Sequence, residues 1–289
     1  MQKLYTLLIL TTIFLVGCEK VVDSDKLLGT EEQVYISSFI APTDTLLRVH
    51  VSKALPAIGT SLNVVDFQVT TDQFLIKDAS VTISDEDGNK TDFTYAEEES
   101  AYIADATNLA IVEGKEYFLK VDVNGEAFNA SCKIPKKVES IMETQIKEQD
   151  QFGNEFTRLN VGFTDLAGER NFYVLGGFFD FTFEEGTFRN NLFFESFGLL
   201  NDAVQDGIIL SAETDFLFSN ELEEPLEVVL QVANVEEIIY QQLQTSNLNR
   251  DSDGNPFIEY GIAADNIQEE NGVGVFAGYQ VTEKVVVFE

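Results

Sequence analysis

The feature that most constrains the fold of this 289-residue chain is a series of short segments in which apolar and polar residues alternate. A period of two residues is typical of a β-strand with one buried face. Residues 116–134 are the clearest case, because Asn124-Gly125 is a strong tight-turn signal between two such segments. Residues 33–55 and 79–97 contain two further hairpin patterns. We therefore expect an antiparallel β-sandwich over residues 34–136.

A second β-rich domain is predicted over residues 137–289, after the polar break PKKVES at 135–140. Residues 144–165 indicate a strand, a Gly-Asn turn and a second strand. A single helix is predicted near 235–247, with Asn234 as its N-cap and Glu237 completing a capping box. The expected fold is thus mainly all-β, with two antiparallel β-sandwich-like domains and one α-helix inserted in the second.

Residues 171–198 are rich in phenylalanine, and Phe179, Phe181 and Phe183 alternate with polar residues. One face of this predicted strand is therefore aromatic. The aromatic face is either a stacking platform for a sugar or another apolar ligand, or core packing in a chain without tryptophan. We predict that the three rings lie in the core.

The chain is strongly acidic, with 50 Asp and Glu against 18 Lys and Arg and a formal net charge of -32. Such a charge repels nucleic-acid phosphates and anionic lipid headgroups, so no nucleic-acid partner is expected. The excess of acid suits either a site for cations or a plain solvated surface, and the second interpretation is the more common one.

The N-terminus carries a secretory signal pattern, in which Lys3 precedes an uncharged, largely apolar run over residues 4–16. This run is too short for a comfortable transmembrane helix. Residues 15–18, Leu-Val-Gly-Cys, resemble the lipobox of bacterial lipoproteins. The resemblance implies a signal peptide over 1–17, lipidation of Cys18 with a diacylglyceryl group and an acyl chain such as palmitate, and a flexible tether over 18–33.

The alternative for Cys18 is a disulfide with Cys132, the other cysteine of the chain. If Cys18 is lipidated, Cys132 has no partner, and we predict that it is a buried strand residue that behaves as a small hydrophobe.

An acidic loop after the predicted helix is a candidate for Ca²⁺, because Asn249, Asp251, Asp253 and Gly254 match positions one, three, five and six of a calcium-binding loop. Position twelve would be Tyr260 rather than a bidentate Glu, so the alternative is a plain polar turn. No other cofactor is expected, because two cysteines and one histidine do not make a usual zinc or iron site.

Catalytic groups are sparse in this sequence. A Ser-His-Asp arrangement would need His50, which lies in a predicted strand and is expected to pack or to face solvent. Paired carboxylates of a glycoside-hydrolase type are possible in so acidic a chain, but no pair stands out. We therefore predict that the protein is not an enzyme.

Several segments together resemble one family: GCEKVVD, ASVTISDEDGN, YFLKVDVNG, LEVVLQVANVEEIIYQQLQ, GNPF and NGVGVFAGY, taken in chain order. They are similar to the domain-of-unknown-function 4249 (DUF4249) family. This resemblance implies a lipoprotein of Bacteroidota, of a kind often encoded near TonB-dependent outer-membrane receptors. The family has no established catalytic residues, so none are transferred.

The leading hypothesis is an outer-membrane lipoprotein that acts as an accessory or ligand-capturing partner of a TonB-dependent receptor. Its lipid anchor would hold it in the cell envelope, on the cell surface or on the periplasmic face. The alternative is a structural or assembly component of an envelope complex that binds no small molecule. A carboxylate-based hydrolase is the third hypothesis.

Overall fold

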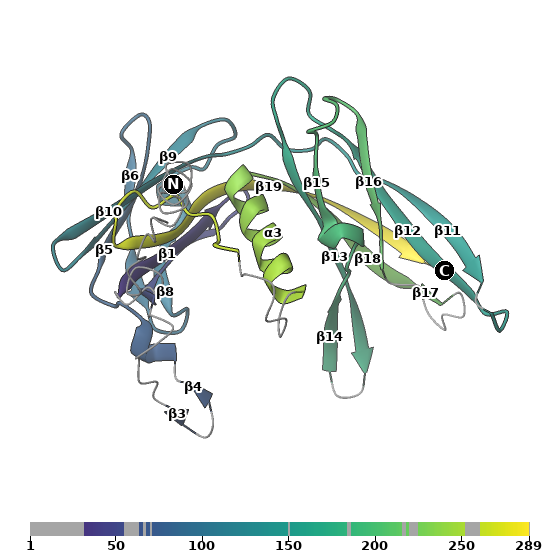
Figure 1. Cartoon of the computed structure of the whole chain (residues 1–289), viewed down its shortest axis with the longest axis horizontal. Helices are drawn as coiled ribbons and strands as arrows, with labels where there is room; N and C mark the ends of the chain where they lie inside the picture. Colours follow the sequence, from purple (N-terminus) through teal and green to yellow (C-terminus); the bar gives the residue numbers. More distant parts are fainter. Residues whose placement is uncertain are drawn as a thin grey trace, which may run out of the picture.

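The computed structural model describes residues 32–54, 64–65, 68–69, 71–149, 151–183, 186–215, 218–219, 225–251 and 261–288. Strands dominate these residues, and two β-sandwiches lie side by side with a helix between them (Figure 1). Over the described residues, the predicted mainly all-β fold with one α-helix is therefore confirmed. Among the residues that the structure describes, no helix has the length and apolar character needed to cross a membrane.

The first sandwich encloses its core between two sheets. One sheet holds β1 (Gln33–Ile40), β2 (Leu46–Ala54), β8 (Ala101–Asp105) and β7 (Thr94–Ala96), and the other holds β10 (Glu126–Lys133), β9 (Glu116–Val123), β5 (Ser80–Asp85) and β6 (Lys90–Asp92). The predicted β1–β2, β5–β6 and β9–β10 hairpins are confirmed. Asn124 and Gly125 both have positive φ, as a type I′ turn requires.

The second sandwich is built in the same way. One layer holds β14 (Gly186–Asn191), β13 (Phe172–Phe183), β18 (Leu226–Val235) and β19 (Gly272–Phe288), with β15 (Leu199–Asn201) beside β13. These strands continue through β19 and β1 into the first sandwich and form one nine-stranded sheet with β1, β2, β8 and β7. The other layer is a separate sheet that holds β11 (Met142–Gln149), β12 (Glu155–Thr164), β16 (Ile209–Glu213) and β17 (Phe218–Ser219). The remaining described elements are β3 (Val64–Val65), β4 (Gln68–Val69) and the 3-10 turns η1 (Thr71–Phe74), η2 (Ala106–Asn108) and η3 (Glu195–Gly198).

Strand β19 belongs to both sandwiches. Its first part pairs in parallel with β1, from Gly272 to Gly278, and its second part pairs antiparallel with β18, from Tyr279 to Phe288. Its side chains accordingly enter two separate cores, with Phe276 in the first and Phe288 in the second. A division into 34–136 and 137–289 therefore does not describe the structure, and one pairing in the first sandwich is parallel.

The sandwiches meet where β19 passes from one to the other. Gly278 lies so close to the end of β10 that a Cβ atom would be 2.7 Å from the backbone oxygen of Lys133. Glu236 spans the junction, since its carboxylate accepts hydrogen bonds from the backbone N–H groups of Lys133 at 2.8 Å and Gly278 at 2.7 Å. Backbone and side-chain contacts thus fix β18, β19 and β10 together.

Helix α3 (Glu237–Asp251) follows β18 after a single residue and crosses the junction (Figure 1). The predicted cap was wrong, because Asn234 is buried within β18. Its side-chain amide donates to the backbone oxygen of Lys136 at 3.0 Å and to Asn171 Oδ1 at 3.3 Å. The strand continues through Val235 because β13 and β19 pair with it on both sides, so the helix begins later than expected.

Candidate functional site

Of the two cysteines for which predictions were made, the structure describes Cys132. Cys132 is a free thiol buried in β10, and burial raises its pKa well above the ordinary range. The prediction that Cys132 is a buried strand residue is confirmed. Its raised pKa disfavours the thiolate, which is the reactive form of cysteine. Cys18 lies outside the described residues.

The candidate calcium loop is only partly described. Asn249 lies on α3, and its side chain accepts from the backbone N–H of Gly261 at 2.8 Å and donates to the backbone oxygen of the same residue at 3.0 Å. Asp251 ends the helix, and its side chain, Asp253 and Gly254 lie outside the described residues. The described contacts of Asn249 thus connect α3 to the chain at Gly261.

His50 is in β2, as predicted, and it lies opposite Ser37 of β1. These two residues, Ser38 and Asp44 line one pocket. However, Ser38 Oγ donates to the backbone oxygen of Arg48 at 2.7 Å, and Asp44 accepts from the backbone N–H of Ala41 at 2.7 Å. These hydrogen bonds of Ser38 and Asp44 therefore go to backbone groups and do not involve the imidazole.

Glu236 is the carboxylate at the junction, and burial raises its pKa, although the two backbone N–H groups act in the opposite sense. A raised pKa in a cleft is a common sign of a general acid. Here both oxygens already accept hydrogen bonds from backbone groups that join β10 to β19. The raised pKa of Glu236 therefore reflects its burial, and the carboxylate itself serves to connect the two strands.

A groove with mainly apolar walls runs along α3. It consists of two adjoining pockets of about 420 and about 400 Å³, a size that suits a small ligand. We define the α3 groove by six residues that line it: Phe193, Phe197, Leu199, Leu243, Asn247 and Arg250. The rings of Phe193 and Phe197 are 66% and 45% exposed, and Leu243 is 38% exposed.

The position of α3 over this groove follows from its contacts with the outer face of the second sandwich. Tyr240 is buried against Phe172 with ring centroids 5.2 Å apart, and its hydroxyl accepts from the Asn201 side chain at 2.9 Å. One turn later, Leu243 is 38% exposed. The C-terminal half of α3 therefore forms one wall of the groove.

The opposite wall has an unusual backbone. Ser196, Phe197 and Gly198 have φ values of 53°, 60° and 69°, all in the left-handed region. A Cβ atom at position 198 would lie 2.4 Å from the backbone oxygen of Leu175, so only glycine fits there. A bulky residue such as phenylalanine rarely adopts this conformation, and such strain concentrates at binding sites. The strained turn holds the Phe197 ring between the two pockets.

One cation faces this aromatic wall. The guanidinium carbon of Arg250 lies 5.1 Å from the centroid of the Phe197 ring, within the range of a cation–π contact. Apolar walls beside an exposed guanidinium are suited to a ligand that combines an apolar body with an acidic group. Asp215 lines the first of the two pockets and Ser196 the second, so the groove also contains a carboxylate and a hydroxyl.

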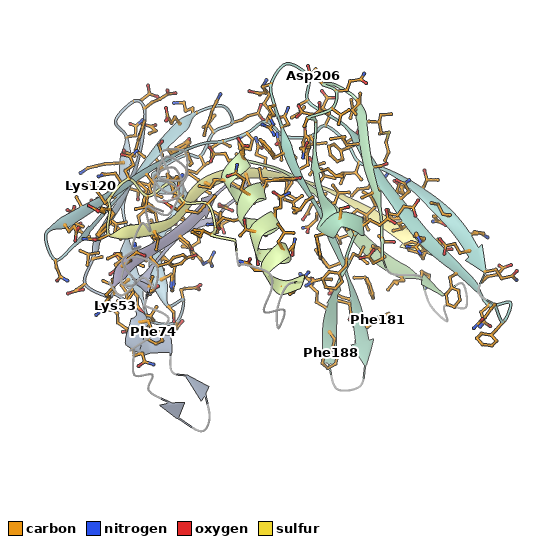
Figure 2. All side chains as sticks on the ribbon, viewed as in Figure 1. Lys53, Phe74, Lys120, Phe181, Phe188 and Asp206 are labelled. Atoms are coloured by element: carbon orange, nitrogen blue, oxygen red, sulfur yellow. The ribbon has the colours of Figure 1, made fainter. Side chains whose placement is uncertain are left out.

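The Phe-rich hairpin differs from its prediction at one residue. Phe179 is buried in the second core at 2% exposure, as expected, but Phe181 is 37% exposed and pairs across the hairpin with the exposed Phe188 (Figure 2). Every residue of β14 is exposed, so the buried face of β13 ends after Phe179. The core prediction was therefore wrong for Phe181, and the side chain of Phe183 lies outside the described residues.

Sequence periodicity missed the α3 groove, because its walls come from a helix and a turn that are about 50 residues apart in the chain. None of the curated proteins compared with the chain matches it. A family model described as a domain of unknown function, DUF4249, matches residues 19–285, and the chain therefore belongs to the DUF4249 family.

Proposed function

We propose that this protein is a non-enzymatic lipoprotein of the outer membrane and that it serves a TonB-dependent receptor as an accessory or ligand-capturing partner. The observation that carries this proposal is the α3 groove, with its exposed aromatic rings, strained turn and neighbouring guanidinium. The lipobox-like residues 15–18 support the anchor. The receptor is the partner that the family resemblance implies.

The chemistry of the groove favours binding over catalysis. Aromatic side chains in a partly enclosed site dominate the energy of many recognition surfaces, and an arginine beside them orients an acidic group. The ligand class that fits is an apolar or aromatic molecule, or a segment of a receptor loop, that carries a negative charge. The acidic protein surface would oppose such a ligand elsewhere, and Arg250 is the positive charge that would attract its acidic group in the groove, where Asp215 also lies.

The proposal is tested by affinity purification of the full chain from membranes, followed by identification of a TonB-dependent receptor in the eluate. Phe193→Ala with Leu243→Ala removes two exposed groove side chains and should reduce receptor recovery about tenfold. Phe152→Ala is the matched control, because this ring is 80% exposed in the turn between β11 and β12. It should leave recovery unchanged.

Two results would contradict the proposal. If wild-type protein brings down no TonB-dependent receptor, the assigned partner is wrong. If the groove variant recovers as much receptor as the Phe152→Ala control, the groove is not the contact, and an assembly role through another surface becomes the better explanation.

A further inference from the structure

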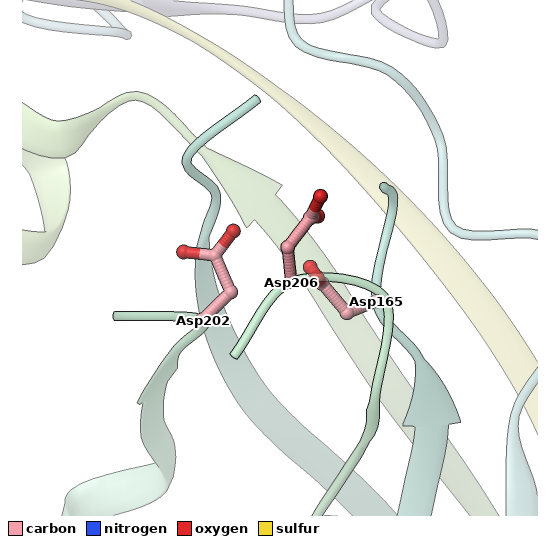
Figure 3. Close-up of side chains that lie close together, drawn as sticks. All are labelled: Asp165, Asp202 and Asp206. Carbon is pink, nitrogen blue, oxygen red and sulfur yellow. The ribbon is translucent and has the colours of Figure 1, made fainter. Parts of the chain in front are cut away.

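Three aspartates meet at one end of the second sandwich, away from the α3 groove. Asp165 directly follows β12, Asp202 directly follows β15, and Asp206 lies in the loop between β15 and β16. Each offers a carboxylate oxygen, and these three oxygens lie within 4.8 Å of one another (Figure 3). Carboxylates from two separate loops are thus gathered around a common point.

Two of these carboxylates are held in place by neighbouring donors. Asp165 accepts from the Tyr173 hydroxyl at 2.6 Å and from the backbone N–H of Gly207 at 2.7 Å. Both oxygens of Asp206 accept from the backbone N–H of Gly168, each at 3.0 Å. The positions of these side chains are therefore fixed by the loops themselves.

Asp202 differs from the other two. The residue is only 7% exposed, and its Oδ1 atom is buried without a hydrogen-bond partner among the described residues. A buried carboxylate oxygen without a partner is costly, and in native proteins such an atom commonly marks a bound water or ion. One carboxylate oxygen of the same side chain lies within 4.8 Å of oxygens of Asp165 and Asp206.

No positive side chain among the described residues forms an ion pair with the three aspartates. Arg170 lines the same depression as Asp202 and Asp206, but it lies 3.8 Å from Glu237 and over the Phe172 ring. Neighbouring carboxylates repel each other when all are ionised. The cluster therefore has no counter-charge from an ion pair with the residues that the structure describes.

We propose that Asp165, Asp202 and Asp206 bind a Ca²⁺ ion. Its ligands would be carboxylate oxygens, with backbone carbonyls and water completing the shell, which suits a hard cation. Ca²⁺ accepts irregular arrangements of six to eight oxygens, whereas Mg²⁺ demands a near-ideal octahedron, and loop-borne carboxylates fit the former. The ion would connect the β12–β13 loop to the β15–β16 loop and give Asp202 Oδ1 its missing partner.

The test is calcium titration of the full chain by calorimetry, together with thermal unfolding in CaCl₂ and in EDTA. We expect one site, and a rise in Tm of about 5 to 10 °C when Ca²⁺ exceeds its Kd about a hundredfold. Asp202→Asn and Asp206→Asn should each weaken binding at least about tenfold and abolish most of this rise. Asp78→Asn, the same change at an exposed position outside the cluster, should preserve both.

The proposal fails if wild-type protein has the same Tm in CaCl₂ and in EDTA and shows no heat of binding. It also fails if both cluster variants retain the wild-type rise, because Ca²⁺ would then act elsewhere on this acidic surface. Asp206 is exposed, so its variant is expected to fold and keeps the test decisive even if Asp202→Asn impairs folding.

Discussion

Phe179 and Phe181 lie two residues apart on the same face of β13, and their rings touch edge to face with centroids 5.0 Å apart. Phe179→Ala should destabilise the protein by about 3 to 5 kcal/mol, because it leaves a cavity in the second core. Phe181→Ala should cost only about 1 to 2 kcal/mol, because its ring is partly exposed already. Urea unfolding of both variants checks this order, and equal losses would contradict it.

Alternation along a strand identifies which residues share a face, and it placed Phe179 correctly. It does not reveal where the opposing sheet ends, because that depends on strands distant in sequence. Phe181 lies beyond the end of the opposing sheet, so its ring is partly exposed. Leu243 is also partly exposed, because the contacts of an apolar helix position likewise depend on segments distant in the sequence. Residue pattern therefore predicts orientation better than burial.

Glu236 provides a residue-scale test of pH dependence. Glu236→Gln keeps one acceptor but turns an NH₂ group toward a backbone N–H, which should cost about 1 to 3 kcal/mol. Burial raises the pKa of Glu236 in the folded state, so its contribution is fully present below the unfolded pKa and decreases as pH rises through the folded pKa. The loss on mutation should therefore be larger at about pH 5 than at about pH 8. Denaturant unfolding at both pH values checks this, and a loss that grows with pH would contradict it.

At the scale of elements, β19 can cross close to β10 because residue 278 is a glycine and has no side chain. Gly278→Ala would place a Cβ 2.7 Å from the Lys133 backbone oxygen and 2.9 Å from Ile134 Cδ1. The backbone of β19 or of the end of β10 would therefore have to move. We expect a loss of about 1 to 3 kcal/mol, as for other overpacked sites. Gly176→Ala in β13 is the control, because its nearest neighbour would be 3.8 Å away. It should be neutral or slightly stabilising in thermal unfolding.

The hairpins were predictable because each is specified by adjacent residues, as Asn124-Gly125 specifies the turn between β9 and β10. The start of α3 was not, because local capping preference at Asn234 competes with strand pairing to β13 and β19. The strand pairing prevails, since it buries Asn234 among hydrogen-bond partners from distant segments.

At the scale of the whole molecule, membrane attachment should depend on one sulfur. Cys18→Ser is expected to move the protein out of the membrane fraction or to leave it uncleaved, because the acyl chains supply the membrane affinity. Cys132→Ser is the control and should leave attachment unchanged, since that thiol is buried in β10. Fractionation of cells followed by immunoblotting measures both. Normal membrane retention of Cys18→Ser would refute the lipoprotein assignment.

The shared strand is the whole-molecule feature that sequence patterns do not reveal. The pairing of Val34 with Gly272 joins residues more than 200 positions apart, and no local turn specifies it. Periodicity does not identify β1 and β18 as successive neighbours of the same strand. The two sandwiches are consequently coupled through a continuous backbone.

This coupling predicts that residues 32–136 do not fold alone. Without β19 the fragment lacks the strand beside β1, and it loses Phe276 and Ile267 from the first core. Loss of a single buried phenylalanine costs about 3 to 5 kcal/mol, which is much of a typical stability of about 5 to 15 kcal/mol. We therefore expect no cooperative urea transition for the fragment, and recovery of one when a peptide of residues 261–280 is co-expressed with it. A cooperative transition in the fragment alone would show that β19 is dispensable and that the first sandwich is an independent domain.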